Sequence, residues 1–445
     1  MYYKIITMVM LFSCLMLHGQ EDNSFSLYEA QSFALDNSEK YKREELEIDI
    51  SKKQIVETRS IGLPQVNSEF SFQNFLNIPV QVLEASAFNP AAPEGELTSF
   101  RFGTDYNSSL GVTVNQLIFD GSYIVGLKVS KFYKSFVEES LKKTKQEVLI
   151  DVAQAYELAL VSRENKYFLD SLVQSTQVLL EQQESLFESG MITQEDVDQT
   201  KYSLLQAKTN LSAANYSYEN AIALLKMNMA YPLENEIYLK DDLNSIMQNV
   251  ISADVDGTVD DNLDLELLRR QKRLSEYDLQ NMRMNNLPKL GTFFNHQYNY
   301  FANEVNLFDT DQWFDQTVIG VSLNIPIFSS GERWARVQKA KIAVKQDEFA
   351  IQELERSLRM REVQFKNDFK AALEQLEMQE ENIRLAQNIY NNALKKAEIG
   401  RENPIMVTQK YNQLISAQSQ YINAMIDIFN ARLNLDELYN NINKR

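Results

Sequence analysis

Residues 111–119 read GVTVNQLIF, and residues 320–328, in the second half of the chain, read GVSLNIPIF. Other landmarks flank both segments in the same order. A Leu-Pro pair lies upstream of each, at Leu63 and Leu287, and a glycine closes a long segment downstream, at Gly190 and Gly400. Landmarks repeated in order indicate two copies of one structural plan. Each copy is predicted to hold a helix, two strands joined by a loop, a very long helix, a tight turn and a further helix.

The predicted first repeat covers residues 25–229 and the second covers residues 262–442, with an acidic, partly irregular connector over residues 230–261. In the first repeat we expect helices over 25–61, 123–189 and 194–229, and strands over about 65–76 and 108–119. In the second we expect helices over 262–287, 332–398 and 404–442, and strands over about 289–301 and 317–328. Proline and glycine mark the loop between the first two strands as the longer one.

The strand segments are about ten residues long and alternate imperfectly between apolar and polar residues, as tilted membrane-crossing strands do. Aromatic residues crowd their ends, among them Phe75, Phe119, Phe301 and Trp313, as at a membrane interface. The alternative is a pair of ordinary hairpins in a soluble protein. We interpret the segments as four transmembrane strands.

The two long helices are predicted over 67 residues each, with no proline and with Gly126 as the one glycine. At a rise of ~1.5 Å per residue, each would extend roughly 100 Å. Apolar residues recur at spacings of three and four, which favours coiled-coil packing against more than one partner helix. The shorter helices have the lengths needed to pack beside the long ones.

Four strands cannot close a transmembrane barrel, because the smallest barrels have about eight. An unclosed edge in lipid leaves backbone groups without hydrogen bonds, at a cost of several kcal/mol each. The chain is therefore predicted to oligomerise. Two copies give eight strands, whose side chains fill the interior, and three copies give twelve, which leave a lumen.

Residues 1–19 are predicted to be a secretory signal peptide, with Lys4 before an apolar run and Gly19 at the cleavage site. The apolar run is too short to span a bilayer. A lipoprotein signal that uses Cys14 is the alternative. Cleavage removes the one cysteine, so the mature chain is predicted to have neither disulfides nor thiolate metal sites.

The formal net charge of −18 argues against nucleic acid as a partner. His296 is the one histidine outside the signal peptide, and no phosphate-binding glycine motif occurs. The sequence accordingly predicts no enzyme, no cofactor and no metal site.

The chain resembles the TolC-like outer membrane factor family, also called outer membrane efflux proteins, over about residues 25–442. The resemblance rests on the doubled layout, on the Pro-Gln-Val and Pro-Lys-Leu entries at residues 64–66 and 288–290, and on the strand exits at residues 117–121 and 326–328. The run GMITQEDV at residues 190–197 resembles the family's helix-turn-helix tip.

This resemblance implies a mainly α protein with a β-barrel portion. A homotrimer would form a twelve-stranded transmembrane barrel in the outer-membrane lipid of a Gram-negative bacterium, with an α-helical periplasmic tunnel. It also implies a periplasmic adaptor (membrane fusion protein) as partner and, indirectly, an inner-membrane efflux transporter or secretion ATPase.

The implied function is the exit duct of a tripartite efflux pump for small molecules. The alternatives are the outer-membrane channel of type I protein secretion and a periplasmic coiled-coil adaptor or structural protein.

The implied adaptor-docking residues lie at the two turns: Gly190, Met191, Ile192, Thr193, Asp196, Val197, Gly400, Arg401, Pro404, Ile405 and Val407. Local structure also explains several of them, since the glycines fit left-handed helix caps and Thr193 with Asp196 fits a capping box. Met406 replaces the family's aspartate at the second turn. The apolar residues Met191 and Ile192 are predicted to be exposed and to contact a partner.

A constriction near the turns is also predicted, from acids and amides that threefold symmetry would bring together. The candidates are Glu184, Glu188, Asn391, Asn392 and Glu398. The alternative for each is a solvated outer face.

Overall fold

The computed structural model describes residues 23–87, 90–252 and 256–442, so the predicted signal peptide lies outside the described residues. The chain forms two compact units. One, here called the helical unit, comprises Met1–Glu47, Val137–Arg269 and Phe349–Arg445, and the other, the sheet unit, comprises Ile48–Phe136 and Arg270–Glu348. Each unit takes segments from both sequence repeats, so the compact units and the repeats divide the chain differently.

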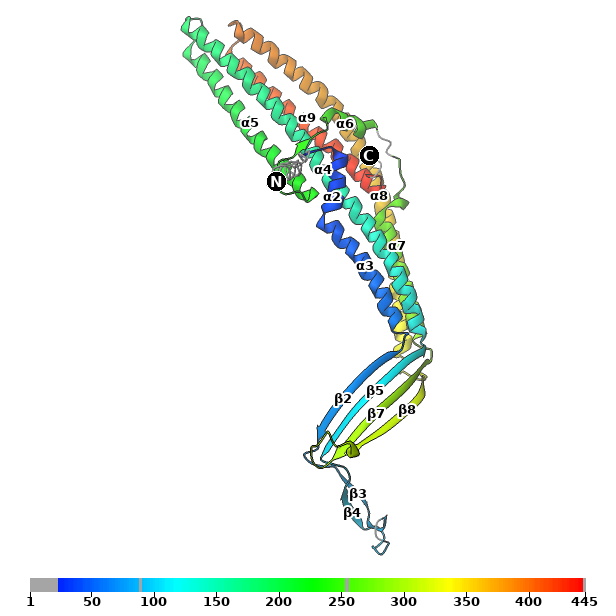
Figure 1. Cartoon of the computed structure of the whole chain (residues 1–445). Coiled ribbons are helices and arrows are strands. Elements are labelled where there is room, and N and C mark those ends of the chain that lie inside the picture. Colours follow the sequence, from blue (N-terminus) through cyan, green and yellow to red (C-terminus); the bar gives the residue numbers. More distant parts are fainter. Residues whose placement is uncertain (1–22, 88–89, 253–255, 443–445) are drawn as a thin grey trace, which may run out of the picture. The chain divides into compact units, whose positions relative to one another are not determined.

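The sheet unit contains a four-stranded antiparallel sheet in the order β2-β5-β7-β8 (Figure 1). Its strands are β2 (Gln65–Asn74), β5 (Tyr106–Phe119), β7 (Lys289–Ala302) and β8 (Trp313–Asn324). The repeats are joined where β5 pairs with β7. Strands β2 and β8 are the edges, and each has a partner on one side only within the sheet.

The predicted bounds 317–328 of the last strand are wrong, because β8 begins and ends four residues earlier. Pairing with β7 sets its position, with Tyr300 opposite Trp313 and Lys289 opposite Asn324. Pro326 has no backbone N–H and cannot extend the ladder further. The other three strands end within two residues of their predicted limits.

The long loop between β2 and β5 has a sheet of its own. Strand β3 (Val80–Glu84) pairs antiparallel with β4 (Leu97–Arg101), and η2 (Ala85–Ala87) follows β3. The loop between β7 and β8 holds only the short η4 (Thr310–Gln312). The insertion that distinguishes the first repeat is therefore a folded hairpin.

The helix predicted over 25–61 is two helices, α2 (Leu27–Asn37) and α3 (Glu39–Ser60). Ser38 separates them: its N–H donates to the Ala34 carbonyl at 2.7 Å, and its hydroxyl accepts from the Tyr41 N–H at 3.3 Å. Serine favours such capping positions because its hydroxyl competes for backbone hydrogen bonds. Helix α7 (Leu263–Met284) ends three residues before its predicted limit.

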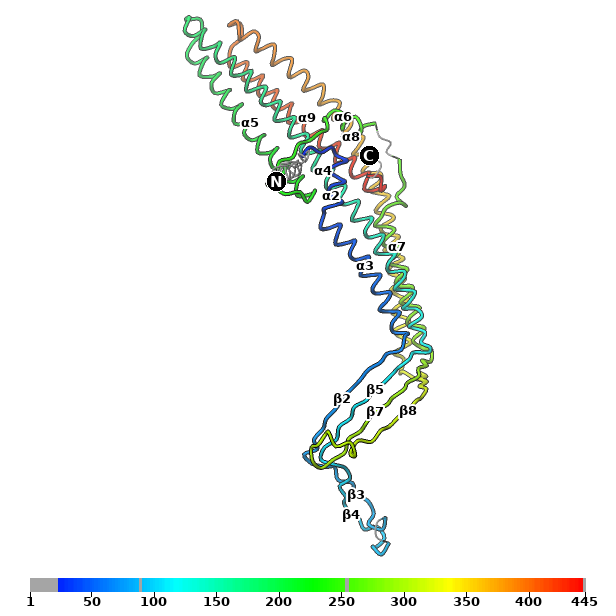
Figure 2. The backbone as a smooth tube through the Cα atoms, in the orientation of Figure 1, coloured from blue at the N-terminus to red at the C-terminus, as the bar shows by residue number. Residues whose placement is uncertain are grey.

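The longest helices are α4 (Gly121–Glu188) and α8 (Glu332–Glu398), and α5 (Gln194–Met229) and α9 (Pro404–Leu438) follow them. Figure 2 shows the turns that join α4 to α5 and α8 to α9. The predicted apolar stripe of α8 is buried in the helical unit at Ala372, Leu376, Tyr390, Ala393 and Ala397. Helix α9 ends at Leu438 rather than at residue 442.

The acidic connector holds short elements: β6 (Tyr238–Leu239), α6 (Leu243–Ser252) and η3 (Val259–Asp261). Strand β6 pairs parallel with β1 (Ser24–Phe25). The Tyr156 hydroxyl, on α4, accepts from the Asp241 N–H of the connector at 3.3 Å and donates to the Phe25 carbonyl at 2.8 Å, and burial raises the pKa of this tyrosine. The connector is thus tied to the long helix. No helix within the described ranges is long and apolar enough to cross a membrane.

Candidate functional site

The turn between α4 and α5 is built on a left-handed glycine. Gly190 has φ +77°, and nothing lies within 4 Å of the place where a Cβ would stand. Its N–H donates to the Phe187 carbonyl at 2.8 Å, and the Met191 N–H donates to the Leu186 carbonyl at 2.9 Å. These bonds satisfy carbonyls that the helix end leaves unpaired. Glycine is therefore needed here for its backbone conformation.

The start of α5 carries a capping box. The Thr193 hydroxyl accepts from the Asp196 N–H, and the Asp196 carboxylate accepts from the Thr193 N–H at 3.0 Å. Val197, one residue on, is buried against Leu180 and Leu204. The turn is thus held by local hydrogen bonds and by one buried side chain.

Met191 and Ile192 do not share one environment. The Met191 side chain is 73% exposed, as the sequence predicted. The sequence also predicts an exposed Ile192, but this side chain is half-buried and packs against the cluster of Leu180, Val197 and Leu204. Its side chain therefore supports the turn, and Met191 is the apolar residue that this turn presents to solvent.

The turn between α8 and α9 has a backbone conformation similar to that of the turn between α4 and α5, but different residues form it. Gly400 has φ +69°, and the Arg401 N–H donates to the Lys396 carbonyl at 2.8 Å. The Asn403 side chain caps α9 by accepting from the Ile405 N–H at 2.8 Å, and Pro404 occupies the first helical turn. Pro404 and Val407 are buried, whereas Arg401, Ile405 and Met406 are exposed.

Hydrogen bonds join the helices next to the two turns. The Thr408 hydroxyl on α9 lies 2.7 Å from the Ser203 hydroxyl and 3.1 Å from the Gln199 amide nitrogen on α5. The Gln183 amide on α4 donates to the Ala397 carbonyl on α8 at 3.2 Å. The predicted docking residues thus lie at the ends of helices that are bonded to one another.

The predicted constriction residues lie on the last turns of α4 and α8. Glu184 and Glu188, one helical turn apart, are both exposed. Asn392 and Glu398 are exposed as well, whereas Asn391 is half-buried and accepts from the Gln387 amide at 3.2 Å. Four of the five side chains are therefore open to solvent in a single chain.

The sheet has two chemically different faces, which the sequence pattern indicated only weakly. Side chains alternate between the faces along a strand, and the strand pairing aligns them across the sheet. The first, here called the apolar face, carries Val66, Phe70, Val112, Phe294, Ile319 and Val321. Ile319 and Val321 are 79% and 71% exposed, so none of the described residues covers this part of the face.

The opposite side of the sheet, here called the polar face, is rich in amides. It carries Asn67, Gln73, Asn107, Asn115, Asn295, Gln297, Asn299 and Gln316. The Asn295 amide donates to the Thr113 hydroxyl at 2.8 Å, and the Gln297 amide donates to Gln316 at 3.0 Å. A sheet with one apolar and one polar face suits a wall between lipid and water.

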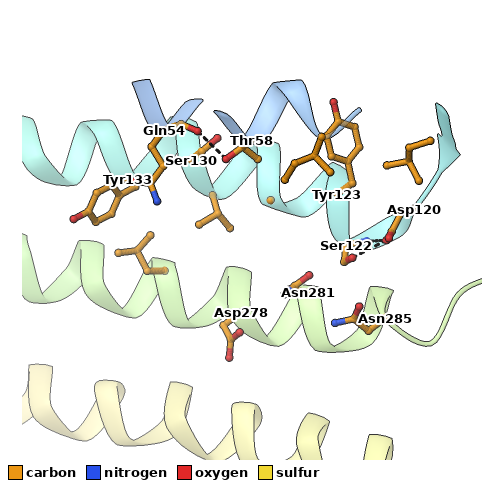
Figure 3. A pocket seen from close by; sticks show the side chains of 15 residues that line it. Gln54, Thr58, Asp120, Ser122, Tyr123, Ser130, Tyr133, Asp278, Asn281 and Asn285 are labelled. Atoms are coloured by element: carbon orange, nitrogen blue, oxygen red, sulfur yellow. Dashed lines mark hydrogen bonds between the residues drawn. The ribbon is translucent and has the colours of Figure 1, made fainter. Parts of the chain in front are cut away.

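In the sheet unit, helices α3, α4 and α7 line a cavity of about 610 Å³ (Figure 3). Most labelled side chains are polar, and the buried Oδ1 atom of Asn281 has no hydrogen-bond partner among the described residues. Burial raises the pKa of Asp120, but hydrogen bonds from Ser122 and Lys289 outweigh it and hold that pKa below its ordinary value. The lining also includes Ile61, Leu117, Val129 and Leu274, so polar and apolar side chains both face the cavity.

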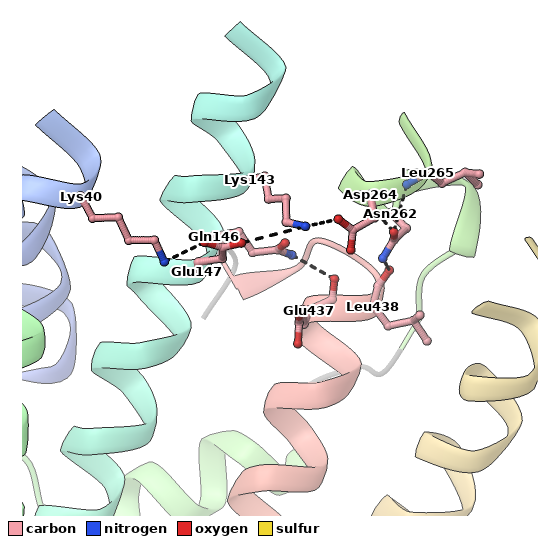
Figure 4. Close-up of polar contacts among 9 residues, drawn as sticks. All are labelled: Lys40, Lys143, Gln146, Glu147, Asn262, Asp264, Leu265, Glu437 and Leu438. Atoms are coloured by element: carbon pink, nitrogen blue, oxygen red, sulfur yellow. Dashed lines mark hydrogen bonds and ion pairs between the residues drawn. The ribbon is translucent and has the colours of Figure 1, made fainter. Parts of the chain in front are cut away.

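Polar contacts in the helical unit tie α4 to its neighbours (Figure 4). The Lys40 ammonium on α3 lies 2.7 Å from the Glu147 carboxylate, and Lys143 pairs with Asp264 on α7. The Gln146 amide donates to the Glu437 backbone carbonyl on α9 at 3.0 Å. These contacts hold four helices together. The part of the chain that is described contains no acid, histidine or cysteine cluster suited to a metal.

The chain matches the outer membrane efflux protein family over residues 31–227 and 260–441. The protease secretion protein PrtF of Dickeya chrysanthemi is 21% identical over 345 residues, which are 76% of this chain and 72% of PrtF.

Several solved structures share the fold. The Campylobacter jejuni outer membrane channel CmeC has a TM-score of 0.68 at 16% identity, with 93% of this chain and 85% of CmeC covered. The channel protein CusC has a TM-score of 0.71 at 13% identity, with 94% and 91% covered. The duplicated fold, the two-faced sheet and the family match over both repeats agree: the chain belongs to the outer membrane efflux protein family and is an exit duct of the outer membrane, with a periplasmic helical tunnel.

Proposed function

We propose that three copies of this chain form one duct, which conducts small molecules from a periplasmic adaptor and an inner-membrane transporter to the exterior. Each copy gives its four strands to a twelve-stranded barrel in the outer-membrane lipid. The proposal assigns the chain a transport role and no catalytic one.

The observation that carries this proposal is the two-faced sheet with two free edges. Among the described residues, no strand pairs with the outer side of β2 or of β8. In lipid, every unpaired backbone group there would cost several kcal/mol. Pairing β8 of one copy with β2 of the next removes both edges. The apolar face then contacts lipid and the polar face contacts water.

The contact between β8 of one copy and β2 of the next is here called the seam. The helices next to these edge strands also support it. Ile50 and Val56, on α3, are exposed in the single chain, and so are Trp334 and Ile342 on α8. Helix α3 precedes β2 and helix α8 follows β8. Apolar side chains at these positions would become buried when the edges of two copies meet.

Cysteine cross-linking tests the seam, because Cys14 is the one native cysteine and lies in the predicted signal peptide. A cysteine at Asn67, Ser71 or Gln73 on β2 is combined with Val318→Cys on β8. We expect at least one pair to give linked dimers and trimers on oxidation. The control pairs Val318→Cys with Thr113→Cys on the central strand β5 and should give no linked species. Absence of trimers from all three edge pairs would refute the proposed assembly.

We also propose that the two turns dock onto the periplasmic adaptor. Met191 at the first turn and Ile399 and Ile405 at the second are more than half exposed, although apolar side chains favour burial. Met191→Glu and Ile405→Glu are each expected to reduce adaptor cross-linking and efflux. Gln194→Glu is the matched control, because it places the same charge on an exposed neighbouring residue. Unchanged cross-linking in both variants would contradict docking at the turns.

The proposed constriction uses Glu184, Glu188 and Glu398, whose charges threefold symmetry would triplicate. Replacing each by glutamine is expected to raise single-channel conductance or to lower cation selectivity. Glu195→Gln, an exposed acid at the start of α5, is the control. Equal conductance and selectivity in all variants would place the constriction elsewhere.

Type I protein secretion is the second candidate, favoured by the similarity to PrtF, a protease secretion protein. Cross-linking and pull-down of the adaptor complex distinguishes the two candidates. An inner-membrane efflux transporter in the complex supports small-molecule efflux, and a secretion ATPase supports protein secretion. Dye accumulation and the extracellular protein pattern of a deletion strain give an independent measurement.

A further inference from the structure

We propose that Glu69 sets the charge selectivity of the barrel lumen and enriches small cationic solutes there. This inference rests on the proposed trimer, in which the polar face lines the lumen. In the four strands β2, β5, β7 and β8, Glu69 is the only acidic residue on the polar face. The one basic residue on that face, Lys289, pairs with Asp120 at 2.9 Å, at the first position of β7.

Strand pairing places Glu69 in a row of neutral residues. Gly111 lies opposite it on β5, Gln297 follows on β7, and Gln316 follows on β8. Gly111 has no side chain beside the carboxylate, and a Cβ there would stand only 3.0 Å from the Gln297 Cβ. Glu69 itself is exposed. The carboxylate therefore stands over open surface on the polar face.

The neutral surroundings give this one carboxylate its influence. Amide and hydroxyl groups carry no net charge and can turn a donor or an acceptor toward a passing ion. A carboxylate attracts cations and repels anions in every orientation. Three copies would place three carboxylates at one level of the lumen, the arrangement that makes charged rings selective for cations. Lumen residues are also the ones that tune selectivity in barrels of this kind.

The ionic atmosphere limits how far this influence reaches. At about 0.1 M salt the Debye length is ~10 Å, and at about 1 M it is ~3 Å. Solutes that pass the Glu69 level within roughly 10 Å of the wall would sense the carboxylates in dilute salt. Neutral solutes would be neither attracted nor repelled by these carboxylates. The expected ligand class is therefore small organic and inorganic cations, bound weakly and released readily.

A cysteine reporter measures the charge of the lumen at this level without depending on the conductance of the rest of the duct. Asn67→Cys lies on β2, two residues from Glu69 on the same face, and is exposed. The full-length variant is purified as the assembled protein in lipid vesicles. Its modification rate is measured with a cationic and an anionic methanethiosulfonate reagent of similar size, with Glu69 intact and with Glu69→Gln.

We expect the ratio of cationic to anionic rates to fall about two- to fivefold in Glu69→Gln at about 0.1 M salt, from Coulomb attraction screened over the Debye length. Glu69→Lys should invert the ratio. About 1 M salt should abolish most of the difference. Asp315→Asn, which removes the one acid on the apolar face, is the matched control and should leave the ratio unchanged.

Two outcomes separate this inference from the proposed function. Ser68→Cys points to the apolar face and should resist both charged reagents in lipid. If Ser68→Cys reacts readily and Asn67→Cys does not, the proposed assignment of lumen and lipid faces is wrong. If the faces behave as proposed but Glu69→Gln leaves the rate ratio unchanged, the role of Glu69 is overturned and the duct stands.

Discussion

The two helix turns of this chain form similar backbone bends with different side-chain chemistry. Both use a left-handed glycine, Gly190 at φ +77° and Gly400 at φ +69°. The first turn then starts its next helix with the reciprocal bonds of Thr193 and Asp196. The second uses Asn403 as the cap, followed by a proline.

This difference separates what a turn requires from what it tolerates. A left-handed residue at the bend strongly favours glycine, since a Cβ there costs about 1–2 kcal/mol. The cap only has to supply one acceptor for the free N–H groups, and several side chains can do so. Met406 occupies the position in the second turn that Asp196 occupies in the first. The second turn therefore stays intact without an aspartate there, but it presents a different side chain to solvent.

The buried valine after each turn should give the largest effect. Val197 and Val407 are 6% and 5% exposed. Replacing either with alanine should cost about 2 kcal/mol, from lost apolar burial and a small cavity. Denaturant unfolding of the purified protein measures the cost, and Val178→Ala, at an exposed position on α4, is the control. Costs that differ by more than about 1 kcal/mol would show that the turns are not packed alike.

The glycines come next. Gly190→Ala and Gly400→Ala should each cost about 1–2 kcal/mol from the strained backbone alone, because nothing lies within 4 Å of either added Cβ. The same unfolding measurement gives both values. A neutral effect at one turn would mean that its backbone can leave the left-handed region, and the comparison between the turns would fail there.

Removing the caps should have a smaller and unequal effect. Thr193→Ala loses a reciprocal pair of bonds and should cost about 1 kcal/mol. Asn403→Ala should cost about half as much, because Pro404 still holds its own φ in the helical range. The difference in unfolding free energy between the two variants is the measured quantity. A larger loss at Asn403 would reverse the interpretation of the two caps.

The smallest effect on stability is expected at two junctions, the one between β5 and α4 in the first repeat and the one between β8 and α8 in the second. In the first repeat Asp120 accepts from the Ser122 N–H at 2.8 Å and pairs with Lys289. In the second, the Arg333 guanidinium donates to the Ser329 hydroxyl at 3.0 Å and to the Pro326 carbonyl at 2.6 Å. One junction therefore depends on an ionised acid and the other does not.

This difference predicts a pH dependence. The folded-state pKa of Asp120 is lowered. Its contribution to stability is therefore present above the unfolded-state pKa of about 4 and is lost as pH falls through the folded-state pKa. Asp120→Asn should cost under about 1 kcal/mol at neutral pH and less at acidic pH. Ser329→Ala should give a small loss that does not change with pH. Unfolding at several pH values tests both expectations.

Local patterns predicted much of the fold. The glycines, the absence of proline in the long helices and the repeated landmarks gave both turns and the limits of α5 and α8 closely, because each depends on residues near in sequence. The break at Ser38 was also local, but a serine inside a polar helix gives a weak signal. The position of β8 and the burial of Ile192 were missed, because each depends on a partner from another segment.

The sequence by itself determined the duplicated plan, the long helices and the two glycine turns. Backbone strain and residue periodicity act over a few neighbouring positions, so they can be identified without a structure. Only the tertiary structure decided that β5 pairs with β7, that β2 and β8 are the edges, and that Glu69 stands among amides on one face. Strand register joins residues far apart along the chain, and in a sheet a shift of one residue moves every side chain to the other face.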